Sequence, residues 1–324
     1  MPATFTMLDL ELLHFWTTQS VQQFVDFENC VELFRTSVVD MAFEHAFMMH
    51  ELLALSALHL SRLRPHKAAI YNQASDSHAT TALMLFQPEI ANLTTKNCHA
   101  CFAFSTTLWV HAWAAQNLKK PSSLFFTPKS GVQENDAMTI QWVKLHRGSH
   151  GISQTLYSVI STGPLEPLFS PWKGLDENRH DPLLEHEKRQ LDDLAEAWKN
   201  SPSIPDEKKE ILDTTLKTLK RIFSMLTYNL NISKLSVVMS WFSMISDEYL
   251  HILEQKMPEA MLLVFYYCVA LKRLEETWWM RGKAENLLNT VRTELGGGWE
   301  RWTRWPIEQV LGDGRGIGPE RMLN

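Results

Sequence analysis

Residues 47–65 read Phe-Met-Met-His-Glu-Leu-Leu-Ala-Leu-Ser-Ala-Leu-His-Leu-Ser-Arg-Leu-Arg-Pro, and this stretch decides the fold class. Leucines at positions 52, 55, 58 and 60 leave almost no polar stripe around a helix, so the pattern predicts a helix buried on most of its circumference. The alanines and serines between them are small enough for neighbouring helices to approach closely. Pro65 is expected to end the helix, because the residue before a proline is pushed out of the helical region.

Helical periodicity recurs along most of the chain, and no run of alternating apolar residues suggests a sheet. We therefore predict an all-α protein, with a single multi-helix domain of about eleven helices over residues 1–311. The predicted helices are 7–18, 25–36, 40–63, 66–86, 95–117, 137–161, 183–199, 206–229, 235–250, 258–281 and 283–295.

Two stretches rich in proline and glycine, 118–136 and 162–182, are predicted to be loops. The second is long for a connection inside a domain, so we expect a surface excursion or a lid over a cavity. The glycine-rich residues 312–324 are predicted to form a flexible tail.

Composition indicates an ordinary folded protein with a sizeable core. The 324 residues are 45% hydrophobic and 21% charged, and the formal net charge of -6 gives no basic footprint for direct nucleic-acid binding. Four irregularly spaced cysteines do not make a disulfide framework, and no signal pattern is visible, so we expect an intracellular protein. The longest strongly apolar stretch, 260–271, is too short to span a bilayer.

Four stretches, in order, resemble the regulatory domain that follows the zinc-cluster DNA-binding module of fungal transcription factors, the sterol-uptake-control group in particular. One is the buried helix at 47–65. The others are 7–18 (Met-Leu-Asp-Leu-Glu-Leu-Leu-His-Phe-Trp-Thr-Thr), 97–105 (Asn-Cys-His-Ala-Cys-Phe-Ala-Phe-Ser) and 266–276 (Tyr-Tyr-Cys-Val-Ala-Leu-Lys-Arg-Leu-Glu-Glu), the last followed by Trp278 and Trp279. Trp299, Trp302, Trp305 and Pro306 close the pattern.

The resemblance implies a transcription regulator that works in the nucleus, or in the cytoplasm until it meets a partner. The family's zinc cluster needs six cysteines, whereas this sequence has four and starts six residues before the resemblance begins. We therefore expect a regulator without its own DNA-binding module, which pairs with a DNA-binding transcription factor or forms a dimer. The alternative is that a zinc cluster lies upstream in a longer reading frame.

Several short motifs are similar to metal-binding, redox or phosphate-binding motifs of other proteins, but each lacks a residue or a spacing that the function requires. Cys98 and Cys101 have the spacing of a zinc or redox pair, yet no second pair of ligands exists, and we expect both to pack in the core. His50 and Glu51 begin a metalloprotease-like string, but the second histidine is missing. His146 and His150 could share a face, although glycines interrupt that helix, and the glycines at 312–318 fit no phosphate-binding spacing. We therefore predict no catalytic residue, no metal site and no cofactor.

Aromatic residues and methionines gather towards the C-terminal end of the sequence. One interpretation is that these rings only pack the last helices together; the other is a deep apolar pocket. The sterol-sensing relatives hold a hydrophobic ligand in this part, which favours the pocket. The candidate ligand-binding residues are Met239, Met244, Met261, Phe265, Tyr266, Trp278 and Trp279.

Two functions from different classes follow. The leading prediction is a non-enzymatic regulator that senses an apolar small molecule, sterol-like or other, or binds a partner regulator. The alternative is a secondary-metabolite enzyme of the cyclase or isomerase type that uses the same pocket. Two ionisable side chains that converge in a closed apolar cavity would favour the enzyme, and a uniformly apolar cavity would favour the sensor.

Overall fold

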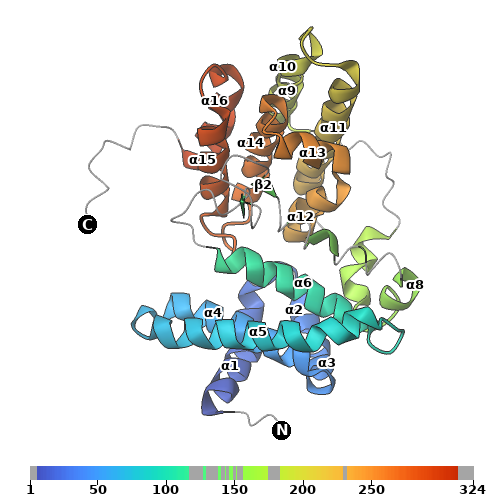
Figure 1. Ribbon diagram of the computed structural model, residues 1–324, viewed down its shortest axis with the longest axis vertical. Helices are drawn as coiled ribbons and strands as arrows, with labels where there is room; N and C mark the ends of the chain where they lie inside the picture. Colours follow the sequence, from blue (N-terminus) through green and yellow to red (C-terminus); the bar gives the residue numbers. More distant parts are fainter. Residues whose placement is uncertain are drawn as a thin grey trace.

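The leucine-rich stretch forms helix α4 (Ala46–Leu63), which lies at the centre of the N-terminal half in the computed structural model of the chain (Figure 1). The structure describes residues 6–116, 127–128, 138–139, 143, 146–148, 151, 156–173, 183–228 and 232–312. Helix α4 ends two residues before Pro65, as predicted, and every residue from Leu52 to Ser61 is buried.

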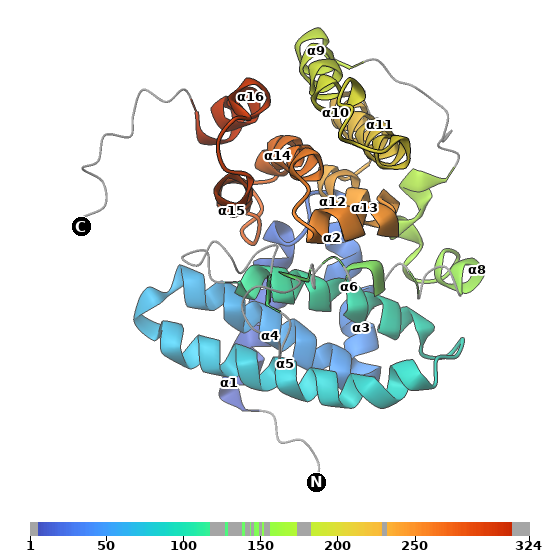
Figure 2. The same cartoon turned by 45° about the horizontal axis from the view of Figure 1, so that its top comes forward.

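The other N-terminal helices surround α4. Helix α1 (Met7–Thr18) begins with a capping box in which Thr6 and Asp9 satisfy each other's backbone N–H groups. Helix α5 (Ala68–Ala91) runs back along α4 as the second arm of a helical hairpin (Figure 2). The remaining elements are η1 (Ser20–Gln23), α2 (Glu28–Arg35), α3 (Ser37–Glu44), η2 (Pro65–Lys67) and α6 (Cys98–Ala115).

The C-terminal half is organised around helix α14 (Pro258–Lys272), in which every residue from Ala260 to Leu271 is buried. Figure 1 shows its neighbours, coloured yellow to red, above the blue and cyan N-terminal helices. They are α9 (Glu185–Leu194), α10 (Glu196–Lys199), α11 (Asp206–Tyr228), α12 (Lys234–Met244), α13 (Asp247–Glu254), α15 (Lys283–Leu295) and α16 (Glu300–Leu311).

Short elements connect the halves. They are the two-residue strands β1 (Thr127–Pro128) and β2 (Met138–Thr139), helix α8 (Tyr157–Ile160), and the 3-10 helices η4 (Glu166–Leu168) and η5 (Ser170–Trp172). The strands pair antiparallel, Thr127 opposite Thr139, and are the only sheet among the described residues. The predicted all-α class is therefore confirmed.

The described residues contain fifteen α-helices, more than the about eleven predicted. Several predicted helices are divided by single residues or short turns that periodicity cannot reveal. The predicted helix 40–63 is broken at His45, which is extended, and 235–250 is broken before Ser246, whose hydroxyl caps α13. The predicted helix 258–281 ends at Lys272, and α16 was missed.

Three predictions fall partly outside the described residues. Of the predicted helix 137–161 the structure describes only short pieces and α8; most of the loop 118–136 and nearly all of the tail 312–324 lie outside. The domain boundary at residue 311 therefore stays a prediction. Residues 162–173 of the second predicted loop are described, and they form short turns on the surface of the bundle.

Side chains cross between the halves at several points. The indole N–H of Trp279 donates to the Phe24 carbonyl at 3.0 Å, and Trp278 stacks on His59 with 4.3 Å between ring centroids. Lys283 donates across the halves to the Trp113 carbonyl in the last turn of α6, and Arg62 donates both to the Ala114 carbonyl in the same turn and, at 3.4 Å, to the Trp278 carbonyl of the other half. The last carbonyls of a helix carry its negative dipole end, so positive charge on these two side chains stabilises the terminus of α6. Burial and the nearby Arg62 charge lower the pKa of Lys283 to about 7.

Asp26 fixes the start of α12 from the other half. Its carboxylate accepts from the Ser233 hydroxyl and, at 3.0 Å, from the Leu235 backbone N–H. Because capping groups contribute about 1 kcal/mol each, Asp26→Ala is expected to lower the free energy of unfolding by about 1–2 kcal/mol. Urea denaturation measures the change, with exposed Asn29→Ala as the control, and equal stability of the two variants would contradict the assignment.

One carboxyl lies wholly within the N-terminal core. Glu51 on α4 is 0% exposed, and neither of its carboxyl oxygens has a hydrogen-bond partner among the described residues. Burial raises its pKa to about 8. The nearest base is His111 Nδ1 at 3.9 Å, and burial lowers the pKa of His111 to about 4. Glu51 and His111 are therefore a neutral pair at pH 7, with the proton on the carboxyl group.

Candidate functional site

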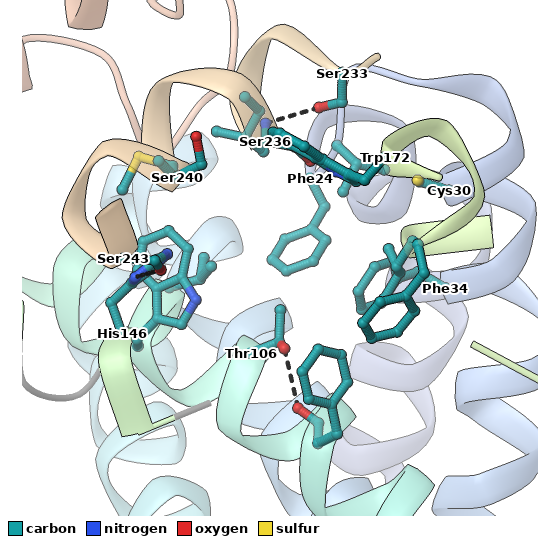
Figure 3. Close-up of a pocket in the computed structure, with 18 of the residues that line it drawn as sticks. Phe24, Cys30, Phe34, Thr106, His146, Trp172, Ser233, Ser236, Ser240 and Ser243 are labelled. Carbon is teal, nitrogen blue, oxygen red and sulfur yellow. Dashed lines mark hydrogen bonds between the residues drawn. The ribbon is translucent and has the colours of Figure 1, made fainter. Parts of the chain in front are cut away.

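A cavity of about 520 Å³ lies where the N-terminal helices, α6, residues 156–173 and α12 meet (Figure 3). Its volume is within the range of about 300–1,000 Å³ that small-molecule sites occupy. The lining residues are Phe24, Val25, Cys30, Phe34, Phe102, Thr106, Trp109, Val110, His146, Tyr157, Leu168, Phe169, Trp172, Arg221, Ser233, Leu235, Ser236, Met239, Ser240, Ser243, Met244 and Trp279.

Eight of the 22 lining residues are phenylalanine, tyrosine or tryptophan, and several of these rings hold one another in place. The ring of Phe24 lies 5.1 Å from that of Phe34, edge to face, and 6.4 Å from that of Trp279. Trp109 contacts Trp279 edge to face at 5.6 Å. All four side chains are less than a tenth exposed, so this part of the wall is packed as tightly as the core and is preformed.

One side of the cavity is a face of α12 that carries three half-buried serines. Ser236, Ser240 and Ser243 are four and three residues apart, which places them on one side of the helix (Figure 3). The Ser240 hydroxyl donates to the Val237 carbonyl at 2.8 Å. The Ser243 hydroxyl lies 3.3 Å from His146 Nδ1. This serine face places hydroxyl groups in a cavity whose described wall is otherwise largely apolar.

Ionisable groups in the lining are few. Among the described lining residues there is one histidine, His146, one arginine, Arg221, and no carboxylate. Burial, and secondarily the Asp26 charge, raise the pKa of the Cys30 thiol to about 11, so that this thiol stays protonated and unreactive at pH 7. The described lining residues thus offer hydrogen-bonding groups but no carboxylic acid to work with a base.

Two lining side chains are also largely open to solvent. Tyr157 of α8 is 49% exposed, and Met244 at the end of α12 is 39% exposed. Both are apolar over most of their surface.

The structure divides the predicted ligand-binding residues into two groups. Met239, Met244 and Trp279 line the cavity. Tyr266 instead packs against Trp305, with 5.3 Å between ring centroids, and Trp278 stacks on His59. Met261 and Phe265 are buried in α14. A ligand role for any of them stays a prediction.

Sequence reasoning missed the half of the wall that comes from before residue 173. Phe24, Phe34 and Trp109 lie in segments where apolar residues equally indicate core packing, and no local signal separates them from other buried rings. Only the approach of α12 and Trp279 to these segments creates the cavity. The glycine- and proline-rich stretch 162–182 was predicted to be a surface excursion or a lid over a cavity, and its described part supplies Leu168, Phe169 and Trp172 to the lining; a lid function stays a prediction.

Within the part of the chain that the structure describes, the cysteines, histidines and glycines that the sequence analysis considered for metal, redox or phosphate binding do not line the cavity, apart from His146. Cys98 and Cys101 are free thiols, each 0% exposed, which fits the predicted core packing. His50 contacts His78, Nδ1 to Nδ1, at 2.8 Å. The described residues contain no group of three or more side chains that could hold a metal ion. His150 and residues 313–318 lie outside the described residues.

The described part of the chain is thus an all-α domain with a largely apolar cavity. Residues 11–124 match the family model of the fungal specific transcription factor domain. The resemblance to fungal transcription factors that the sequence indicated is therefore confirmed.

Two relatives have been compared over longer stretches. A Zn(2)-C6 fungal-type transcription factor of Gibberella zeae is 23% identical over 333 residues, which cover 96% of this chain and 63% of that protein. Sterol uptake control protein 2 of Candida albicans is 30% identical over 131 residues, or 40% of this chain and 17% of that protein. The chain thus covers less than two thirds of the length of either relative. Within the described part of the chain, every helix is too short or too polar to cross a membrane.

Proposed function

We propose that this chain is the ligand-binding regulatory domain of a transcription regulator, and that its ligand is a largely apolar small molecule held in the cavity. The observation that carries the proposal is the composition of the cavity wall. Phe24 and Phe34 come from the N-terminal half, whereas Met239 and Trp279 come from the C-terminal half. A ligand that fills the cavity contacts both halves, so that its binding favours the arrangement in which they are closed on each other.

The lining also defines the chemistry of the ligand. Aromatic rings and methionines select a hydrocarbon body, since burying apolar surface contributes about 25 cal/mol per Å². The serine face of α12 selects a neutral hydroxyl or carbonyl group, because a buried polar atom without a partner costs about 1–3 kcal/mol. We propose a neutral molecule with one or two such groups.

A binding role accounts for the cavity better than catalysis does. An enzyme of the cyclase or isomerase type needs an acid and a base that converge on the substrate. Ser243 and His146 are within hydrogen-bond distance, but the described lining residues include no carboxylic acid that could act on a substrate together with them. The fungal transcription factor relatives favour the same choice.

The relatives also support a cellular setting. A protein that matches a fungal transcription factor domain and a Zn(2)-C6 transcription factor is expected to act in the nucleus. With a net charge of -6 this chain has little attraction for the DNA backbone. We propose that a DNA-binding transcription factor, or a second copy of the chain, supplies or completes the contact with DNA.

Filling the cavity tests the proposed function. Ser236→Trp places an indole where the serine face meets the cavity, and we expect it to weaken binding of the neutral fluorescent probe N-phenyl-1-naphthylamine at least tenfold. Ser77→Trp, at an exposed position of α5, is the matched control. Fluorescence titration measures both affinities, and circular dichroism checks that both variants are folded. Equal affinity of folded Ser236→Trp and the parent protein would exclude the cavity as the binding site.

A further inference from the structure

Residues 156–173 form one wall of the cavity, which includes the half-exposed Tyr157, and this wall is built only from short helical turns. It supplies Tyr157, Leu168, Phe169 and Trp172 to the lining. Its longest helix, α8, has four residues, and η4 and η5 have three residues each. Helices this short are not stable by themselves, so the segment depends on its contacts with the rest of the protein.

Internal contacts hold the segment together as a unit. The ammonium group of Lys173 reaches back to the Ser161 carbonyl at 3.2 Å and to the Glu166 carboxylate at 3.3 Å. The ring of Tyr157 contacts that of Phe169 edge to face at 5.7 Å. Movement of one part of the segment therefore carries the rest with it.

Two side chains of α6 contact the segment: Phe102, whose ring lies 5.4 Å from that of Phe169, and His99, which makes the polar contact. The Nε2 atom of His99 lies 3.2 Å from the Val159 carbonyl, which can only accept a hydrogen bond, so Nε2 carries the proton. The other ring nitrogen, Nδ1, is 3.7 Å from the Cys98 sulfur, whose single thiol proton also has the Thr95 carbonyl within reach at 3.6 Å. The Val159 carbonyl therefore decides the tautomer of His99 that binds the segment.

The same imidazole lies against Gly163 at the middle of the segment. A Cβ atom at Gly163 would be 2.1 Å from His99 Nε2 and 2.9 Å from Cε1. The absence of a side chain at position 163 is therefore what permits the hydrogen bond to Val159. Neither His99 nor Gly163 lines the cavity.

We propose that residues 156–173 are the gate through which ligand enters and leaves the cavity, and that His99 and Gly163 form the latch that holds it shut. Both latch residues are positioning residues, since they act through the wall that carries Tyr157 and Trp172. The ligand part of this inference rests on the proposed function; the opening of the segment does not.

Gly163→Ala tests the latch. The added methyl group displaces the imidazole, and we expect faster hydrogen exchange at backbone amides bonded within the segment, such as those of Ser161 and Phe169, by about tenfold or more. Stopped-flow release of N-phenyl-1-naphthylamine should accelerate by a similar factor. Gly148→Ala is the matched control, because a Cβ there meets nothing within 4 Å.

A double variant distinguishes loss of the latch from general destabilisation of the fold. His99→Ala alone should also open the gate, because it removes the hydrogen bond to Val159. The methyl group of Gly163→Ala clashes only with the His99 imidazole. The backbone amides of residues 156–173 should therefore exchange no faster in the double variant His99→Ala with Gly163→Ala than in His99→Ala alone. Additive effects of the two changes would overturn the latch.

The two proposals fail in distinguishable ways. Faster exchange confined to residues 156–173, without probe binding in any variant, would support the gate and contradict the proposed ligand cavity. Unchanged exchange in both single variants, or faster exchange throughout the core, would overturn the gate even if the probe binds.

Discussion

Glu51→Gln is expected to stabilise the protein by about 3 kcal/mol at pH 7. Burial raises the pKa of Glu51 to about 8, against about 4.5 in the unfolded chain. Below pH 4.5 the carboxyl is protonated in both states and stability is not affected. Between pH 4.5 and 8 only the unfolded chain releases the proton. The free energy of unfolding of the parent protein therefore falls progressively as pH rises through this range. Glutamine is neutral throughout and avoids this loss.

Urea denaturation of the parent protein and Glu51→Gln at pH 5 and pH 7.5 measures the effect. The difference between the two proteins should be small at pH 5 and should grow with pH. Glu210→Gln, on the exposed side of α11, is the control and should change stability by less than about 0.5 kcal/mol at either pH. A Glu51→Gln variant less stable than the parent at pH 7.5 would contradict a buried neutral carboxyl.

Trp279→Ala is expected to lower the free energy of unfolding by about 3–5 kcal/mol, the usual range for truncation of a buried aromatic ring. Trp279 is 0% exposed and lies against both Phe24 and Trp109, so it connects the two halves. Its removal also leaves the Phe24 carbonyl without its indole donor. The variant should therefore lose probe affinity together with stability, because the Trp279 ring belongs both to the cavity wall and to the contact between the two halves.

Trp279→Phe separates the two contributions. The phenyl ring keeps most of the apolar contact but cannot donate to Phe24, and we expect a loss of about 1–3 kcal/mol. Urea denaturation gives the stability of both variants, and probe titration gives their affinity. Loss of less than 1 kcal/mol in Trp279→Ala would show that this ring does not hold the halves together.

The contacts between the two halves also suggest how a bound ligand would change the conformation of the domain. The contacts between the halves include two hydrogen bonds next to the cavity. Asp26 accepts one from the Leu235 backbone N–H at the start of α12, and Trp279 donates the other to the Phe24 carbonyl. Filling the cavity would add contacts to the same interface, so ligand binding and closure of the halves should favour each other by the same free energy. Movement of one half against the other is then the change that a partner regulator could detect.

The amino-acid pattern by itself determined the all-α class, the buried helix at 47–63 and the family resemblance. Burial on nearly all sides leaves a local record, because a helix with leucines all round cannot face water. Helix ends were less visible, since the breaks at His45 and before Ser246 interrupt no apolar pattern. The core packing of Cys98 and Cys101 also followed from the lack of further ligands at a matching spacing.

Tertiary structure alone decided which aromatic side chains surround the cavity. Trp278 and Trp279 are adjacent in sequence and chemically identical, yet one stacks on His59 and the other lines the cavity. Phe24 and Phe34 reach the site only because α12 and Trp279 pack onto the N-terminal helices. Hydrophobicity is not directional, so a sequence shows that a ring will be buried but not which neighbours will surround it.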